Sequence, residues 1–458
     1  MSAPATRPRP VRRAPSEFSL PVERAHLDRL TPGTPDRLVA DRTAAFDAFE
    51  ALAPETNLLY TTYLDLRSAD LGDATIAGPG SNLVSMDGHL TVDEDGVIEL
   101  VDGAPVAATL SVAARTAGVT LTSLADLLHS DPERALDLLA DRGTLPTDDK
   151  FAQLTRALWS DGVVLDVPAG VRLAKPILMR WASGTPGVAT FGRTIIRLGD
   201  GASVSVVEEL IPNGVASTDT AQSFLAGTTE VTLGTGASLS MASIQDLGPT
   251  TVAFQHRTAR IGEAATVHWA LAQLGSRLTR SRVDNRLEGD RSSVEQAEIV
   301  FGGEEQLFDL TSYTRHVGRD TTGNLLSKGA LLDRARGYMK GMITIERSAV
   351  GTDSYLGEFG MNLSKGARSV AIPSLEIDQP DCRRAAHASS VGPIDETQLF
   401  YLESRGIPPD EARKFIVLGF LEPVVARVPL AEAQDRLRSL LEEKWDASAG
   451  GPAAVTAA

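Results

Sequence analysis

Cysteine and aromatic residues are scarce in this sequence. Among 458 residues there is a single cysteine, and phenylalanine, tryptophan and tyrosine together make up 5%. One cysteine cannot form an internal disulfide, and it cannot build a closed zinc or iron–sulfur site without other residues or another chain. The sequence therefore indicates a reducing compartment and excludes a fold stapled by disulfides.

Long apolar runs and an excess of positive charge are also missing. No stretch reaches the roughly 18 apolar residues of a membrane-spanning helix, so no membrane association is expected. The net charge is −16, and such a surface repels nucleic-acid phosphates, so no nucleic-acid partner is expected. The motif GxxxxGK[ST] does not occur, so we expect no nucleotide site on this chain.

Composition predicts a disordered tail at each end of the chain. A mostly helical domain is expected after the N-terminal tail. Residues 1–33 begin with arginines among prolines and lack the apolar segment of an export signal, and residues 447–458 have the sequence ASAGGPAAVTAA. Residues 34–160 show apolar side chains at helical spacing, which predicts a mostly helical domain with Thr147 as one N-cap. A glycine-turned hairpin is expected within residues 87–106.

The spacing of apolar residues changes to that of short strands at Asp161. A phrase of strand, tight turn and alternating strand recurs, with its turns at GDGAS, GTGAS, GEAAT and SKGAR, and the first three copies are spaced by 35 and 28 residues. One such unit cannot bury its apolar face, whereas stacked copies share a core. Residues 161–393 are therefore predicted to form a β-solenoid, most simply a parallel β-helix. A β-sandwich or barrel stays open as an alternative.

Helical spacing returns over residues 394–446. Gly406 is expected to end one helix, and Pro408–Pro409–Asp410 to begin the next. The run from Phe415 to Val425 is unusually apolar. Helices that cap the open end of a solenoid would bury one face only, so the remaining apolar surface predicts a partner.

Several long motifs resemble one known family. QLFYLESRGI with FIVLGF resembles the C-terminal signature of the SufB/SufD family of iron–sulfur cluster assembly scaffold proteins. Upstream, LWSDGVVLDVPAGVRLAKPI, SKGALLDRARGYMKGMITI and SKGARSVAIPSLEI resemble its β-helix. The resemblance covers roughly residues 150–445. The version AHASSVGPIDETQLFYLESRGI looks more like the SufD branch than the SufB branch.

The resemblance implies a mainly β protein with flanking α-helices: a right-handed parallel β-helix core with helical N-terminal and C-terminal domains. It implies a non-catalytic scaffold in the cytoplasm, which pairs with a SufB-like subunit and docks a SufC-like ABC-type ATPase that hydrolyses the ATP. Sulfur would arrive as persulfide from donor proteins, and flavin binding by this chain stays open. Within the docking domain, residues 394–446, the candidate contacts are Leu399, Phe400, Arg405, Phe415 and Phe420.

The resemblance also implies a site for a transient iron–sulfur cluster or iron, shared with the partner subunit. The family's functional histidine maps onto His387, which we expect in a loop at the subunit interface; a neutral imidazole is a competent iron ligand. Cys382 is displaced from the family's cysteine position, but adjacent Arg383 and Arg384 would favour a reactive thiolate. His316 matches a histidine near the dimer face, and a structural hydrogen bond is its favoured role.

Three other functions are weighed against the scaffold. Ser390, His387 and Asp395 could be drafted into a hydrolase triad, but no strained nucleophile turn is present. A carbohydrate-active β-helix enzyme would need paired carboxylates and aromatic residues, and no such cluster stands out. A SufB-like homodimeric scaffold is the third alternative.

Overall fold

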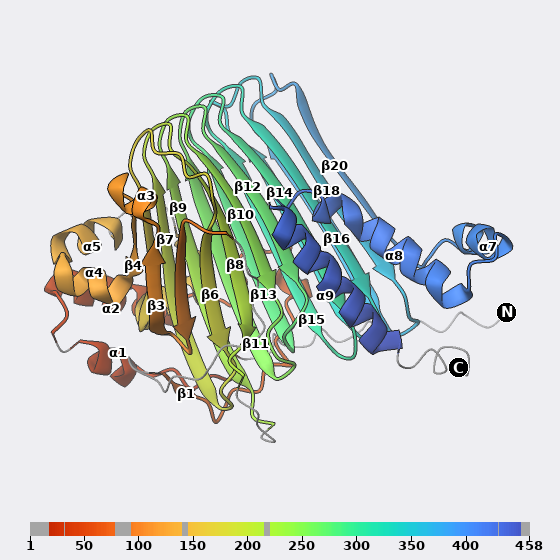
Figure 1. The fold of residues 1–458 in the computed structure, drawn as a ribbon, viewed down its shortest axis with the longest axis horizontal. Coiled ribbons are helices and arrows are strands. Elements are labelled where there is room, and N and C mark those ends of the chain that lie inside the picture. The colour runs from red at the N-terminus through yellow and green to blue at the C-terminus, as the bar shows by residue number, and fades with distance from the viewer. Residues whose placement is uncertain are drawn as a thin grey trace, which may run out of the picture.

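The structure is a computed structural model that describes residues 18–31, 33–77, 93–139, 145–214, 220–428 and 430–449. Its centre is a parallel β-solenoid in which successive strands alternate between two sheets (Figure 1). The odd sheet contains β5 (Asp161–Val167), β7 (Val188–Leu198), β9 (Ser223–Leu233), β11 (Thr251–Ile261), β13 (Leu278–Leu287), β15 (Leu307–His316), β17 (Arg336–Ile345) and β19 (Arg368–Ile377). The even sheet contains β6 (Ile177–Ser183), β8 (Ser203–Pro212), β10 (Ser238–Gln245), β12 (Thr266–Gln273), β14 (Ser293–Gly302), β16 (Thr322–Leu331), β18 (Asp353–Asn362) and β20 (Arg384–Gly392). The predicted solenoid is confirmed, and the sandwich or barrel alternative is wrong.

The repeated phrase marks successive coils. Ser238 pairs in register with Ser203 on one side and Thr266 on the other, and these three residues end the first three copies. The turn in each of the first three copies contains a residue with positive φ, which is Gly201 in the first, Gly236 in the second and Ala264 in the third. Since glycine adopts this conformation without steric cost, the glycine pattern marks the turn.

The fourth copy, SKGAR, lies elsewhere than its pattern suggests. It forms the turn from β18 to β19, whereas the first three copies join an odd strand to the following even strand. It therefore occupies the opposite edge of the solenoid. Both edges join one strand to another through a tight turn, so their local sequences look alike.

Strand alternation sends apolar side chains to the inside of the solenoid. One cluster of buried residues fills the first coils, with Val163, Leu239, Val267 and Val283 among its members. Two smaller clusters, around Met339 and around Leu356, fill the last coils. Because stacked coils share these clusters, no coil can bury its apolar face alone.

The N-terminal elements extend the solenoid and cover the odd sheet. Strands β2 (Gly96–Val101) and β3 (Ala104–Leu110) form the expected hairpin at one end of the even sheet, and β4 (Thr120–Ser123) pairs with β5. The short strand β1 (Thr75–Ile76) pairs with β7. The helices are α1 (Ala25–Leu30), α2 (Asp36–Ala51), α3 (Val112–Thr116), α4 (Leu124–Ser130), α5 (Pro132–Leu139) and α6 (Lys150–Leu158), with a 3-10 turn at Thr61–Tyr63.

Part of the predicted N-terminal tail is ordered. Phe18 packs edge-on against Phe151 of α6 and Phe224 of β9, with ring centroids 5.1 and 5.6 Å away. Leu20 is buried in the same cluster, and α1 follows it. Long-range aromatic packing, which local composition does not reveal, orders this segment. Residues 1–17 and 450–458 of the predicted tails lie outside the described residues.

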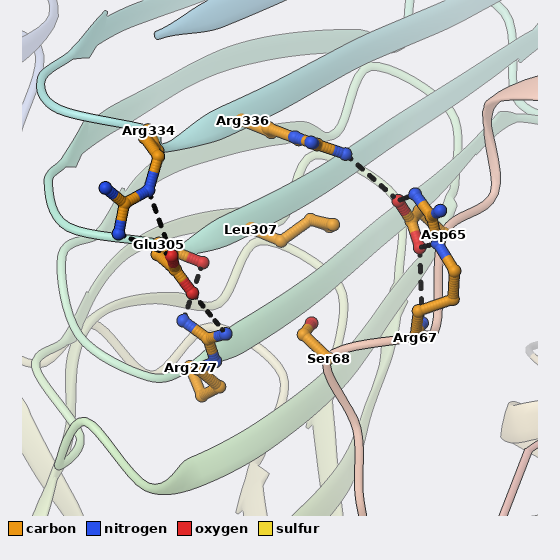
Figure 2. Close-up of a pocket in the computed structure, with 8 residues that line it drawn as sticks. All are labelled: Asp65, Arg67, Ser68, Arg277, Glu305, Leu307, Arg334 and Arg336. Carbon is orange, nitrogen blue, oxygen red and sulfur yellow. Dashed lines mark hydrogen bonds and ion pairs between the residues drawn. The ribbon is translucent and has the colours of Figure 1, made fainter. Parts of the chain in front are cut away.

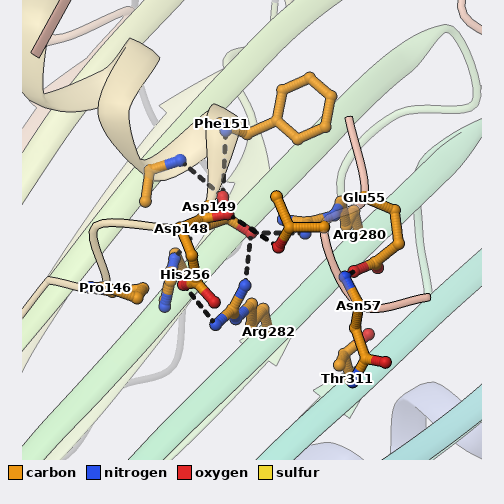
Figure 3. A network of polar contacts seen from close by, with 12 residues as sticks. Glu55, Asn57, Pro146, Asp148, Asp149, Phe151, His256, Arg280, Arg282 and Thr311 are labelled. Carbon is orange, nitrogen blue, oxygen red and sulfur yellow. Dashed lines mark hydrogen bonds and ion pairs between the residues drawn. The ribbon is translucent and has the colours of Figure 1, made fainter. Parts of the chain in front are cut away.

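A buried ionic network fixes α6 to the odd sheet (Figure 3). Asp149, and not the expected Thr147, is the N-cap, because its Oδ1 accepts hydrogen bonds from the backbone N–H groups of Phe151 and Ala152 at 3.0 and 2.8 Å. Its Oδ2 pairs with Arg280 and Arg282 of β13 at 2.6 and 3.1 Å. Burial opposes ionisation, but the two guanidinium groups outweigh it and hold the pKa of Asp149 well below its usual range.

The C-terminal helices lie along a sheet and do not cap the open end as expected. Helices α8 (Pro409–Val425) and α9 (Ala431–Ala449) pack on the outer face of the even sheet, where α8 contacts β14 and β16 (Figure 1). Val417 and Leu421 of α8 share a buried cluster with Ile299 and Phe301 of β14. The preceding helix, α7 (Glu396–Ser404), projects away from the solenoid (Figure 1). The last coil is therefore left uncovered by these helices.

Candidate functional site at the open end of the solenoid

The solenoid ends in two unpaired strand edges. Strand β19 is the last strand of the odd sheet, and β20 is the last strand of the even sheet, in the described part of the chain. Ile377 of β19 and Val391 of β20 are 45% and 39% exposed. Unpaired backbone groups beside exposed apolar side chains form a surface that favours strand pairing with another chain.

His387 lies on this edge, but in a strand and not in the expected loop. It is an exposed residue of β20 and pairs in register with Leu356 of β18, which is buried in the core. Registered partners in a parallel sheet share a face, so His387 lies on the inner face of the last coil. It is exposed there because no further coil stacks upon it. The imidazole is thus available at the open end.

Glu358 of β18 is a second polar residue of this end, and the sequence analysis missed it. It pairs in register with Ser389, two residues after His387 on the same face of β20. Its side chain is buried, and Oε2 accepts a hydrogen bond from the Ile372 N–H of β19 at 2.9 Å. Burial raises the pKa of this carboxyl to about 7. The sequence did contain a signal for this site, because a glutamate stands at an inward position of a strand whose apolar and polar residues alternate.

Cys382 lies in the turn before β20. Its half-buried side chain packs against the core cluster that contains Ile343, Leu356 and partly buried Ala385. The adjacent Arg383 and Arg384 form ion pairs with Asp320 and Asp353 respectively. These contacts suit a packing role, and reactivity of the thiol stays a prediction.

His316 is at the end of β15 inside the solenoid and is fully buried. Its Nδ1 lies 2.8 Å from the Thr321 hydroxyl, and its Nε2 lies 2.9 Å from the Ser354 hydroxyl. Burial lowers the pKa of this imidazole to about 4, so it is neutral at pH 7. With both ring nitrogens engaged, His316 has the geometry of the structural hydrogen bond that was the favoured expectation.

A second exposed apolar surface lies on α7 and the start of α8. Helix α7 has no buried residue, and Phe400 is 71% exposed with Tyr401 beside it. Arg405 stacks over the Tyr401 ring at 5.2 Å, and Phe415 of α8 is 63% exposed. A short helix that buries none of its side chains fully is marginally stable in water, so this surface is suited to docking. Tyr401 was absent from the predicted contacts.

Two predicted docking residues are less available. Leu399 of α7 is half-buried. Phe420 is also half-buried and lies against the solenoid, where the Lys328 ammonium sits 4.6 Å from its ring centroid and donates to its carbonyl at 2.7 Å. Phe420 therefore contributes more to attaching α8 than to an exposed surface.

The drafted hydrolase triad is not assembled. Ser390 follows His387 by three positions on β20. Because successive side chains of a strand alternate between its faces, the two point to opposite faces. Asp395 is the N-cap of α7 and accepts a hydrogen bond from the Thr397 N–H. Among the described residues, no group of three or more histidine, cysteine, aspartate or glutamate side chains is arranged to hold a metal ion. In the same part of the chain, no helix has the length and apolarity needed to cross a membrane.

Comparison with known proteins identifies the family to which the chain belongs. Residues 181–420 match the family model described as SUF system FeS cluster assembly, SufBD core domain. The iron–sulfur cluster assembly protein SufD of Bacillus subtilis is 30% identical over 75% of this chain and 78% of its own length. A SufBD family protein of Mycobacterium tuberculosis is 27% identical over 70% of this chain and 80% of its own length. SufB of B. subtilis is 28% identical over 67% of this chain and 64% of its own length. The chain therefore belongs to the SufBD family of iron–sulfur cluster assembly proteins.

Proposed function

We propose that this chain is a SufD-like scaffold subunit of a cytoplasmic assembly complex. It pairs through the free edges of β19 and β20 with a SufB-like subunit, and His387 contributes one ligand to iron or a nascent cluster carried at the junction. The observation that carries the proposal is the uncovered last coil, where an exposed imidazole stands on a strand edge. The iron and the cluster are cargo of the complex.

The C-terminal helices would dock the SufC-like ATPase. The exposed apolar side chains of Phe400, Tyr401 and Phe415 lie on α7 and α8. Helix α8 is packed on the even sheet through Val417 and Leu421, so movement of a docked ATPase could be transmitted to the solenoid. Since ATP would be hydrolysed by that partner, this chain acts as a non-catalytic scaffold.

The test is a reconstitution with the SufB-like and SufC-like proteins of the same organism. Wild-type and His387→Ala chains are co-expressed with both partners, and each complex is purified and measured for size, iron and acid-labile sulfide. We expect H387A to assemble normally and to hold much less iron and sulfide, because the imidazole is exposed and its removal leaves no buried cavity.

The matched control is His268→Ala. His268 is also on the even sheet, on β12, where its Nδ1 lies 3.5 Å from Glu295. Loss of loading in H387A but not in H268A supports the assignment. Equal loading in H387A and wild type removes His387 from the cargo site, and a stable homodimer that ignores the SufB-like subunit would favour the homodimeric alternative.

A further inference from the structure

Four arginine side chains line a hollow on the odd sheet, at the edge where even strands turn into odd strands (Figure 2). It has a volume of about 320 Å³ and lies between three successive coils and the segment that joins the 3-10 turn at Thr61–Tyr63 to β1. The segment supplies Asp65 and Arg67. The coils supply Arg277 before β13, Glu305 before β15, and Arg334 and Arg336 at the start of β17.

The two carboxylates of the hollow are already occupied by arginines. Asp65 Oδ1 accepts from Arg67 Nε at 2.8 Å, and its Oδ2 accepts from Arg67 Nη2. Glu305 Oε1 accepts two hydrogen bonds from Arg334, at 2.9 and 2.6 Å, and its Oε2 accepts one from Arg277 at 3.2 Å. The arginine partners lower the pKa of both carboxyls. Both acids are therefore ionised and fully engaged at neutral pH.

Positive charge and hydrogen-bond donors remain after this pairing. Four guanidinium groups against two carboxylates leave two positive charges, in a chain whose net charge is −16. Within the described residues, the Arg336 side chain makes one ion pair, with its Nη1 3.6 Å from Asp65 Oδ2. This is beyond hydrogen-bonding distance, so its N–H donors are unused. Figure 2 shows the Arg336 side chain reaching across the hollow towards Asp65.

The hollow is open to its ligand and has an apolar side. The Arg67 and Arg336 side chains are each half exposed, and Arg334 is more so. Leu307, a buried residue of β15, lies between the two ion-paired groups (Figure 2). The volume of the hollow is at the lower end of the range for small-molecule pockets, which begins at about 300 Å³.

We propose that this hollow binds the phosphoryl group of a small phosphorylated molecule. Planar guanidinium forks match phosphate oxygens in charge and geometry, and a phosphoryl dianion would balance the two remaining charges. Arg336 and the outer nitrogens of Arg67 and Arg334 supply the donors. This inference is independent of the cargo site, since it involves none of the residues of β19 or β20.

The test measures binding of pyrophosphate and inorganic phosphate to the full chain by isothermal titration calorimetry in low-salt chloride buffer. We expect saturable pyrophosphate binding at one site, weakened about tenfold or more in Arg336→Gln. The control is Arg291→Gln, which removes an exposed arginine paired with Glu263 on the opposite edge of the solenoid. We expect inorganic phosphate to bind more weakly than pyrophosphate. This difference distinguishes a site for the free ion from a site for a larger phosphorylated ligand.

Three results would overturn the proposal. They are the absence of saturable binding to wild type, equal affinities for wild type and R336Q, and equal losses in R336Q and R291Q. A glutamate-rich peptide that binds while pyrophosphate does not would instead assign the hollow to an acidic protein segment. Because the Arg336 side chain forms no hydrogen bond within the described residues, R336Q should melt at the wild-type temperature, and this measurement separates binding from folding.

Discussion

Replacement of Glu358 by glutamine should stabilise the protein at alkaline pH. This carboxyl is 1% exposed, with burial as the main cause of its raised pKa and only the Ile372 N–H to stabilise its anion. No charged group lowers its pKa. The backbone of Gly341 lies against Oε1, since a Cβ built there would be 2.8 Å away. Glutamine keeps the shape of the side chain and can accept the same hydrogen bond.

The magnitude follows from the shift of the pKa from 4.5 to about 7. Below pH 4.5 the carboxyl is protonated in both states. Between pH 4.5 and about 7 the unfolded state releases its proton while the native state keeps it, so the free energy of unfolding falls over this range and levels off once the native carboxyl also ionises. At about 1.4 kcal/mol per pKa unit, the loss is about 3 kcal/mol at pH 8.

Urea unfolding of wild type and E358Q from pH 5 to pH 8, followed by circular dichroism, measures this effect. The variant should gain up to about 3 kcal/mol over wild type at pH 8, and the gain should shrink towards pH 5. Glu376→Gln, which alters an exposed carboxylate on β19, should show no such trend. A gain for E358Q that is the same at both pH values would refute the reasoning.

Three further substitutions test other parts of the molecule. Asp149→Asn should destabilise the fold by about 3–5 kcal/mol in urea unfolding, because Arg280 and Arg282 would keep their buried charges without the carboxylate; a change under about 1 kcal/mol would contradict this. Ile377→Lys places a charge on the free edge of β19 and should abolish co-purification with a SufB-like subunit while the melting temperature is kept; retained pairing would move the interface elsewhere. Phe400→Ala removes the most exposed large apolar side chain of α7 and should weaken SufC-like ATPase binding about tenfold or more in titration calorimetry; unchanged affinity would exclude α7 as the docking surface.

The solenoid could be predicted because its signals are local. The repeat of a positive-φ turn between alternating strands occurs within about ten residues of sequence, and Gly201 and Gly236 mark it directly. The helix that begins at Pro409 was predicted for the same reason. The opposite edge of the solenoid was misplaced because the turn at SKGAR has the same local pattern as the first three copies.

The site could be predicted only in part. Resemblance supplied His387, but its position on a strand and on the inner face depends on the register of β20 with β18. Glu358 is 29 residues from His387 along the chain. In the sheet it is only two residues from Leu356, the residue that pairs with His387. The Asp149 network joins residues 131 positions apart. Contacts of this kind are set by how many residues each turn contains, which periodicity does not specify.

The uncovered last coil also has a consequence for the cell. A newly synthesised chain has two strand edges, on β19 and β20, whose backbone groups are unpaired. A second copy of the same chain can pair with these edges. Because both edges lie at the same end of the solenoid, such self-pairing would close into a dimer and occupy the surface intended for another chain. Co-translation at matched dosage with the chain that covers this coil would prevent that outcome.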